Sequence, residues 1–187
     1  HLLVVSVAAV VIRLPEAGAV ALGVALGWIA RSLLRIRRGV VRENLARAFP
    51  EQSPGWYKRV TRASYRHLGR EVVSVLRFGR MLPAEIRSRC AVEGLELIRR
   101  PLARGQGVIV LGGHFGNWEV AGASLTARGI PVDAVVRRQS NPLFDKYMIH
   151  ARRRLGWGVI YQDKATRRVM KCLQDSRVIA LVAELKY

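Results

Sequence analysis

Cysteine is scarce in this sequence, and its scarcity excludes several kinds of protein. The 187 residues include two cysteines, Cys90 and Cys172, which lie far apart and fit neither a metal-binding nor a redox spacing. A small secreted domain held by disulfides needs more of them, at closer spacing. We therefore expect a reduced, cytosol-facing domain in which both thiols are inert.

Acidic residues are also few. The chain has 13 Asp and Glu against 32 Lys and Arg, which gives a formal net charge of +19. Such a surface favours an anionic partner, which could be nucleic acid, anionic lipid or an acidic protein. Most of the basic residues are arginines, whose forked guanidinium suits phosphate. A basic surface that is merely solvated is the alternative interpretation.

Long apolar runs are missing too, although the N-terminal part is the most apolar of the chain. Residues 2–12 and 17–30 are apolar, but neither run reaches the roughly 18 residues expected of a spanning helix. We expect residues 1–34 to form a membrane anchor, with one helix spanning or dipping into the bilayer and Pro15 opening a second. Trp28 would lie near the interface. A signal peptide is disfavoured because no small-x-small cleavage site precedes a polar start.

A cluster of arginines follows the apolar segment. It consists of Arg31, Arg35, Arg37, Arg38 and Arg42. Basic residues beside an apolar segment mark the cytoplasmic side and attract anionic headgroups. A DNA-binding arm is the alternative, but it would not explain the apolar residues before the cluster.

The region after the arginine cluster reads as helical and basic. Residues 40–50 predict a short amphipathic helix that stops at Pro50, and residues 53–79 predict a longer one that opens with Ser-Pro. We place a basic helical region at residues 35–90.

From residue 91 onward, apolar strands alternate with amphipathic helices. We expect strands at 107–111, 131–136, 158–161 and 178–183, and helices at 117–127, 142–155 and 165–174. This alternation predicts an α/β fold with a mostly parallel sheet flanked by helices. We assign residues 91–187 to this α/β core and expect it to be incomplete at the C-terminus, since the chain starts at His1 and stops at Tyr187.

The stretch Gly-Gly-His-Phe-Gly-Asn-Trp-Glu, residues 112–119, lies directly after the first predicted strand. Ligands bind beyond the carboxyl ends of strands in such sheets, which makes His114 a candidate general base. Glu119 could fix the tautomer of the imidazole. Asn117 could cap the next helix, and Gly113 and its neighbouring glycines would admit a bulky acceptor and expose backbone N–H groups to an oxyanion. A loop histidine bonded to backbone remains the alternative.

No serine or cysteine nucleophile accompanies this histidine. Ser124 lies further along the helix, and both cysteines lie in other elements. The pair is therefore expected to activate a substrate hydroxyl directly. A metal site is disfavoured because His67 and His150 lie in other segments and no His-Glu-x-x-His pattern occurs.

Several motifs, in order, resemble one known family. They are VRENLARAFP (41–50), ASYRHLGREVVSVL (63–76), VEGLE (92–96), GVIVLGGHFGNWE (107–119) and NPLFDKYMIHARRRLG (141–156). Together they resemble the late acyltransferases of bacterial lipid A biosynthesis, the lauroyl/myristoyl transferase family. The resemblance covers nearly the whole chain, and members of that family are longer.

The resemblance implies transfer of an acyl chain from an acyl carrier protein thioester to a hydroxyl of a membrane lipid, without a metal or redox cofactor. It implies that His114 and Glu119 are catalytic. It further implies a functional arginine after the Asn-Pro helix, which we place at Arg152, with Arg153 and Arg154 as alternatives in register. Arg137 fits the family pattern too, and these arginines would bind lipid or pantetheine phosphate.

One segment departs from the family pattern. The family usually shows Asp-Gln after the last strand, where this chain has Glu184-Leu185. Glu184 keeps a carboxylate and stays a candidate substrate-binding residue, together with Asn117 and Gly113. A degenerate family member is therefore one alternative.

Residues and resemblance together predict a membrane-associated O-acyltransferase at the cytoplasmic face of the inner membrane. Its partners would be an acyl carrier protein as donor, a lipid A precursor as acceptor and the anionic inner leaflet, and not nucleic acid. One alternative is an acyltransferase of the same fold that acts on a phosphoinositide mannoside or glycerophosphate-type lipid with acyl-CoA. Another is a basic membrane-surface or nucleic-acid-binding protein without activity.

Overall fold

The computed structural model describes residues 11–183. The chain divides into two units, one ending at Arg77 and the other beginning at Phe78. The boundaries expected from composition, at 34/35 and 90/91, stay predictions. Part of the predicted N-terminal anchor, residues 1–10, and the predicted substrate-binding Glu184 lie outside the described residues.

The first unit is helical. It contains α2 (Glu16–Ser32), α3 (Arg38–Ala48) and α4 (Pro54–Phe78). These helices confirm the three helical segments expected from the sequence, with Pro15 directly before α2. None of the helices within residues 11–183 is both long enough and apolar enough to cross a membrane.

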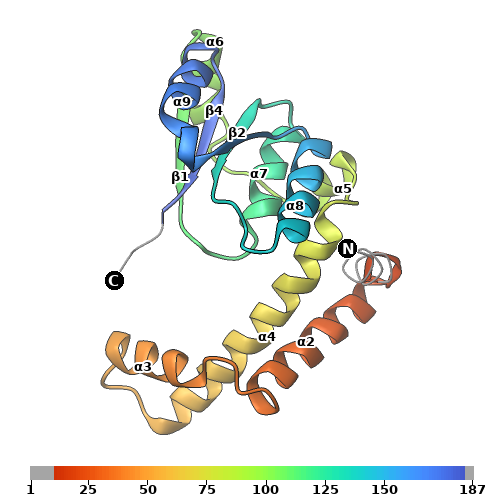
Figure 1. Ribbon diagram of the computed structural model, residues 1–187, viewed down its shortest axis with the longest axis vertical. Coiled ribbons are helices and arrows are strands. Elements are labelled where there is room, and N and C mark those ends of the chain that lie inside the picture. Colours follow the sequence, from red (N-terminus) through yellow and green to blue (C-terminus); the bar gives the residue numbers. More distant parts are fainter. Residues whose placement is uncertain (1–10, 184–187) are drawn as a thin grey trace. The chain divides into compact units, whose positions relative to one another are not determined.

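Glycines let α2 and α4 approach closely (Figure 1). A Cβ added at Gly23 would lie 2.7 Å from the Cα of Arg70, and one at Gly27 would overlap the carbonyl of Tyr65. Gly69 of α4 faces Gly23 and Gly27 in the same way. Backbone-to-backbone contact of this kind leaves no room for any side chain at the crossing.

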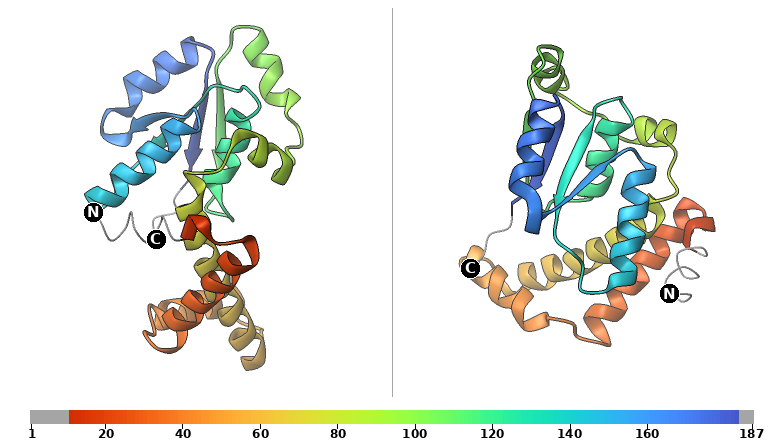
Figure 2. Two further views of the ribbon diagram at one scale, coloured as in Figure 1. Left: turned by 90° about the vertical axis from the view of Figure 1, so that its right-hand side faces the viewer. Right: turned by 45° about the horizontal axis from the view of Figure 1, so that its top comes forward.

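The second unit is built on a four-stranded parallel sheet in the order β1-β4-β2-β3. The strands are β1 (Val108–Gly112), β2 (Val132–Val136), β3 (Gly158–Tyr161) and β4 (Val178–Val182). All four lie where the apolar runs predicted them. The predicted mostly parallel sheet flanked by helices is confirmed (Figures 1 and 2).

Three of the helices around this sheet were expected and two were not. The expected ones are α7 (Trp118–Thr126), α8 (Pro142–Arg154) and α9 (Ala165–Gln174), the last preceded by the 3₁₀ turn Gln162–Lys164. The sequence analysis did not resolve α5 (Pro83–Arg89) as a separate helix within the helical region expected at residues 35–90, and it missed α6 (Glu96–Ala103). Both are short, and Pro101 interrupts the pattern of α6. Seven or eight residues give too few turns for a helical period to stand out.

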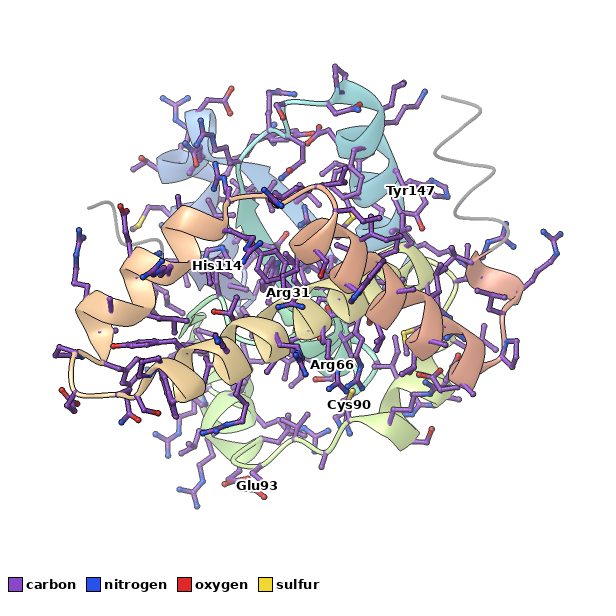
Figure 3. The ribbon with its side chains drawn as sticks, turned by 90° about the horizontal axis from the view of Figure 1, so that it is seen from below. Arg31, Arg66, Cys90, Glu93, His114 and Tyr147 are labelled. Carbon is purple, nitrogen blue, oxygen red and sulfur yellow. The ribbon has the colours of Figure 1, made fainter. Side chains whose placement is uncertain are left out.

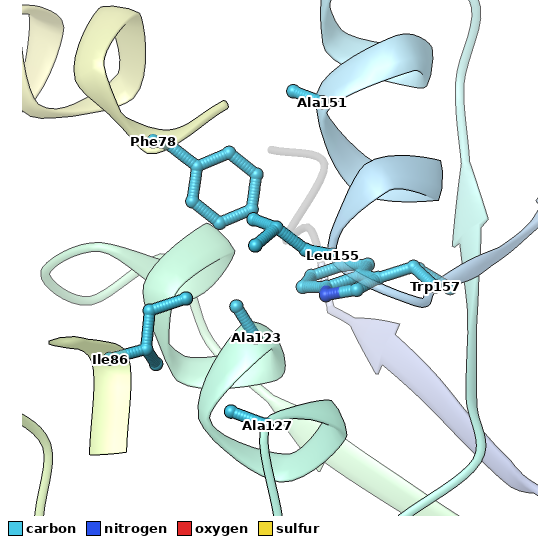
Figure 4. Packing of buried hydrophobic residues seen from close by; sticks show 8 residues of the cluster. Phe78, Ile86, Ala123, Ala127, Ala151, Leu155 and Trp157 are labelled. Carbon is cyan, nitrogen blue, oxygen red and sulfur yellow. The ribbon is translucent and has the colours of Figure 1, made fainter. Parts of the chain in front are cut away.

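The core of the second unit lies where α7 and α8 meet the end of α4 and the helix α5. Phe78 and Ile86 are fully buried there, with Ala123, Leu155 and Trp157 packed around them (Figure 4). The rings of Phe78 and Trp157 meet edge to face with centroids 6.3 Å apart. A second cluster centres on Val132 and Val178 of the sheet, with apolar residues of α6 against it.

Candidate active site

The loop from β1 to α7 carries the predicted histidine. The strand ends at Gly112, and Gly116 takes a left-handed backbone with φ of 55°, which glycine adopts without steric cost. His114 is exposed, and its imidazole meets the ring of Trp118 edge to face at a centroid distance of 4.9 Å. His114 is labelled among the side chains of Figure 3.

Asn117 caps α7, as the sequence predicted. Its side-chain oxygen accepts a hydrogen bond of 3.0 Å from the backbone N–H of Val120. The cap fixes where the first helical turn begins. Glu119, in that first turn, consequently points into the protein and is 3% exposed.

Glu119 pairs with Arg152 of α8. The Nε of Arg152 donates to Oε2 of Glu119 at 2.9 Å, and its Nη2 donates to Oε1. Both side chains are almost fully buried, so the forked guanidinium satisfies a carboxylate that has lost its water. Among the described residues, no hydrogen bond or ion pair joins His114 to Glu119.

This arrangement corrects one expectation about geometry. The sequence suggested that Glu119 contacts the imidazole of His114 directly. In the structure both carboxylate oxygens of Glu119 are occupied by Arg152, because α8 packs beside α7. Of the three arginines considered in register, Arg152 is buried against Glu119, whereas Arg153 and Arg154 are exposed. Arg154 donates to the carbonyl of Gly79 at 2.6 Å.

One cavity brings the predicted residues together. It has a volume of about 1350 Å³ and lies beyond the carboxyl ends of β1 and β2, the edge where parallel sheets bind ligands. Six predicted site residues line it: Gly113, His114, Asn117, Glu119, Arg137 and Arg152. Glu119 and Arg152 are 33 residues apart in the sequence, and the packing of α7 and α8 in the second unit brings them together.

The loop after β2 forms the basic side of the cavity. Arg137 and Arg138 both line it, and the guanidinium carbon of Arg138 lies 3.9 Å from the ring centroid of Tyr161. The hydroxyl of Tyr161 donates to Asp145 at 2.9 Å, and Asp145 also accepts the backbone N–H of Gln139 at 2.9 Å. Burial, with help from Asp145, raises the pKa of Tyr161. The hydrogen bonds that Asp145 accepts from Tyr161 and Gln139 tie the loop after β2 to β3 and α8.

The sequence analysis missed two tryptophans of this site. Trp118 and Trp157 both line the cavity. The Trp157 ring packs on the backbone of Gly122, and the Arg152 guanidinium carbon lies 6.0 Å from its centroid. Its buried indole N–H has no hydrogen-bond partner within the described part of the chain. The position of Trp118, directly before Glu119, was the one available signal, and Trp157 offered none.

The sequence matches the family described as bacterial lipid A biosynthesis acyltransferase over residues 1–187. It is 28% identical over 178 residues to the lipid A biosynthesis palmitoleoyltransferase of Escherichia coli (strain K12), covering 94% of this chain and 57% of that relative. The same values hold for the lipid A biosynthesis acyltransferase of Shigella flexneri.

The chain belongs to the bacterial lipid A biosynthesis acyltransferase family. The resemblance drawn from the motifs is thereby confirmed. The chain spans about 57% of the length of the curated relatives that it matches.

Proposed function

We propose that this chain carries the acyl-transfer site of a lipid A biosynthesis acyltransferase. One observation carries the proposal: His114 and the Glu119–Arg152 pair line a single cavity at the ligand-binding edge of a parallel sheet. Family membership supports the class of reaction. The acceptor is a hydroxyl of a lipid A precursor, and the donor is the thioester of an acyl carrier protein.

In the proposed reaction His114 is the general base. Its imidazole removes the proton of the acceptor hydroxyl, and the oxygen attacks the thioester carbonyl. The C–S bond then breaks, and the proton passes from the imidazolium to the leaving thiolate. The exposed position of His114 at the cavity allows both substrates to reach it.

Glu119 and Arg152 act on His114 in this proposal. Arg152 holds the carboxylate of Glu119 in one orientation, and the imidazole turns from Trp118 toward it when substrate occupies the cavity. The carboxylate then stabilises the imidazolium. Backbone N–H groups near Gly113 stabilise the oxyanion, and Arg137 and Arg138 bind a phosphate of either substrate.

The proposed location is the cytoplasmic face of the inner membrane, where a lipid acceptor and a soluble thioester donor can meet. The net charge of +19 supports it, because the inner leaflet and acyl carrier proteins are both anionic. Anchoring of the protein by its apolar N-terminal residues is part of the same proposal.

The test measures acyl transfer by the full-length protein in detergent, with labelled acyl carrier protein thioesters and a lipid A precursor. His114→Ala and Glu119→Gln should each lose several orders of magnitude in kcat/KM. His150→Ala is the matched control, since His150 is an exposed histidine on α8 outside the cavity lining, and it should keep full activity.

Persistent transfer by His114→Ala would refute the general-base role. If the wild type is inactive with the lipid A precursor but transfers acyl groups from acyl-CoA to another glycolipid, the proposed acceptor and donor are wrong while the site stands. If no lipid is acylated and the protein instead binds DNA with strong salt dependence that survives His114→Ala, the enzymatic proposal fails.

A further inference from the structure

The end of β3 lies beside the start of the loop after β2. These two strands pair in parallel, and Val136, the last residue of β2, lies opposite Tyr161, the last residue of β3. Side chains of opposite residues share one face of a sheet, and so do side chains two positions apart along a strand. Arg138, two positions after Val136, is thereby brought to the side of the sheet where Tyr161 lies, and its guanidinium is held over the Tyr161 ring.

The guanidinium of Arg138 has a fixed place but no neutralising partner. The face of an aromatic ring attracts a cation, while the N–H groups of the guanidinium edge stay available to an anion. Among the described residues, no hydrogen bond or ion pair engages the side chain of Arg138 or that of Arg137, and both line the cavity. The cavity wall therefore carries two uncompensated positive charges at this point.

Asp145 of α8 fixes both the ring and the loop. One of its carboxylate oxygens accepts from the hydroxyl of Tyr161 and the other accepts from the backbone N–H of Gln139. The ring under Arg138 and the residue directly after Arg138 thus depend on one carboxylate. Asn141 caps α8, which sets the place of Asp145 in the first helical turn.

The surroundings of Tyr161 suit a phosphate group. Burial, followed by Asp145, raises the pKa of Tyr161, and the charges of Arg138 and Arg153 oppose the rise, so both guanidinium groups lie near the phenol. Directly after Arg138 and Tyr161 in the chain, the cavity is lined by the polar residues Gln139, Ser140 and Gln162. Guanidinium groups together with hydroxyl and amide donors are the groups that bind phosphate oxygens.

We propose that Tyr161 and Asp145 are positioning residues, which hold Arg138 in place to bind a phosphate ester of a substrate. Contact with the ring restricts a long side chain before the substrate arrives, so less conformational entropy is lost when the phosphate binds. This inference rests on the proposed function, which supplies two phosphate esters to be distinguished. They are the phosphopantetheine of the acyl donor and the phosphates of the lipid A precursor.

The first experiment measures binding without acyl transfer, using the full-length protein in detergent. Each phosphorylated ligand is compared with its phosphate-free counterpart: phosphopantetheine with pantetheine, and the lipid A precursor with the same lipid after phosphatase treatment. The ratio of the two affinities isolates the contribution of the phosphate. We expect a preference of about tenfold or more for the phosphorylated form of at least one ligand. The ligand whose preference is lost in Arg138→Gln is the one whose phosphate Arg138 binds.

Variants of the two positioning residues test their part. Tyr161→Leu removes the ring and the hydroxyl and should reduce this preference by about fivefold, whereas Tyr161→Phe keeps the ring and should reduce it less. Asp145→Ala loses both hydrogen bonds and should act like Tyr161→Leu. A general loss of structure would weaken both members of a ligand pair alike and would leave the ratio unchanged.

The matched control is Asp163→Asn. Asp163 is an exposed carboxylate two residues after Tyr161 and outside the cavity lining, so this variant should keep the wild-type preference. In acyl transfer, Tyr161→Leu and Asp145→Ala should raise KM by about fivefold for the substrate so identified and leave kcat nearly unchanged.

Three results would overturn the proposal. They are a wild type that prefers neither phosphorylated ligand, a preference that survives Arg138→Gln, and wild-type preference in both Tyr161→Leu and Asp145→Ala. Failure of the proposed function has a different signature, because the protein would then discriminate between the ligands of a pair and still acylate nothing.

Discussion

Arg152 binds Glu119 through both carboxylate oxygens, and this buried pair joins α8 to α7 across 33 residues of sequence. It places a carboxylate beside the His114 loop while His114 itself rests against Trp118. The pair is thus part of the packing of the second unit as well as of its candidate active site.

The first prediction concerns the stability of this pair. Arg152→Met leaves the Glu119 carboxylate buried without its partner, which should lower the free energy of unfolding by about 3–5 kcal/mol. Adding Glu119→Gln removes the stranded charge and should recover most of the loss. Urea unfolding of the two variants measures both values. Equal stability of the single and double variants would show that the pair is not buried as described.

A second prediction concerns the α2–α4 crossing, where two glycines on one helix differ in their surroundings. Gly27→Ala should lower the free energy of unfolding by about 2 kcal/mol or more. The added Cβ would overlap the Tyr65 carbonyl, and neither helix backbone can move aside easily. Gly18→Ala should be neutral or stabilise by up to about 1 kcal/mol, since its nearest neighbour, in the Pro15 ring, would lie 3.6 Å away. Thermal unfolding compares the two, and a similar cost for both would contradict the close crossing.

The third prediction tests the helix cap of the active-site helix. Asn117→Ala removes the acceptor of the Val120 N–H and should cost about 1 kcal/mol, whereas Asn117→Asp should keep most of the stability. Because Glu119 follows two residues later, the alanine variant should also lower kcat/KM for acyl transfer. Chemical unfolding and kinetics together check this, and an aspartate variant as unstable as the alanine variant would argue against the capping role.

The fourth prediction concerns pH. Burial, followed by the negative charge of Asp133, raises the pKa of the Cys172 thiol above its ordinary value of 9.0, against the opposing charge of Arg177. The folded state therefore favours the protonated thiol, and its contribution to stability is complete below the unfolded pKa and is lost as pH rises toward the folded value. In a Cys90→Ser background, the alkylation rate of Cys172 should reach its midpoint at a higher pH in the folded than in the denatured protein. A folded midpoint at or below the denatured one would disprove the shift.

The strands and several helices could be predicted directly from the sequence. The apolar runs of the four strands, and the helical spacing of apolar residues in α3, α4 and α9, are properties of neighbouring residues. Asn117 at the start of α7 is a capping signal of the same kind, and the histidine after a strand end pointed to the correct edge of the sheet.

The sequence by itself determined the α/β class, the order of strands and helices in the second unit, and the loop that carries His114, because apolar periodicity and turn residues act over a few positions. The tertiary structure alone decided that β4 lies between β1 and β2, that Arg152 rather than His114 holds Glu119, and that Trp157 lines the cavity. The first outcome depends on strand pairing between distant segments, and the other two depend on which side chains meet when α7 and α8 pack together. A carboxylate that loses its water on burial needs a charged partner, and Arg152 supplies it for Glu119.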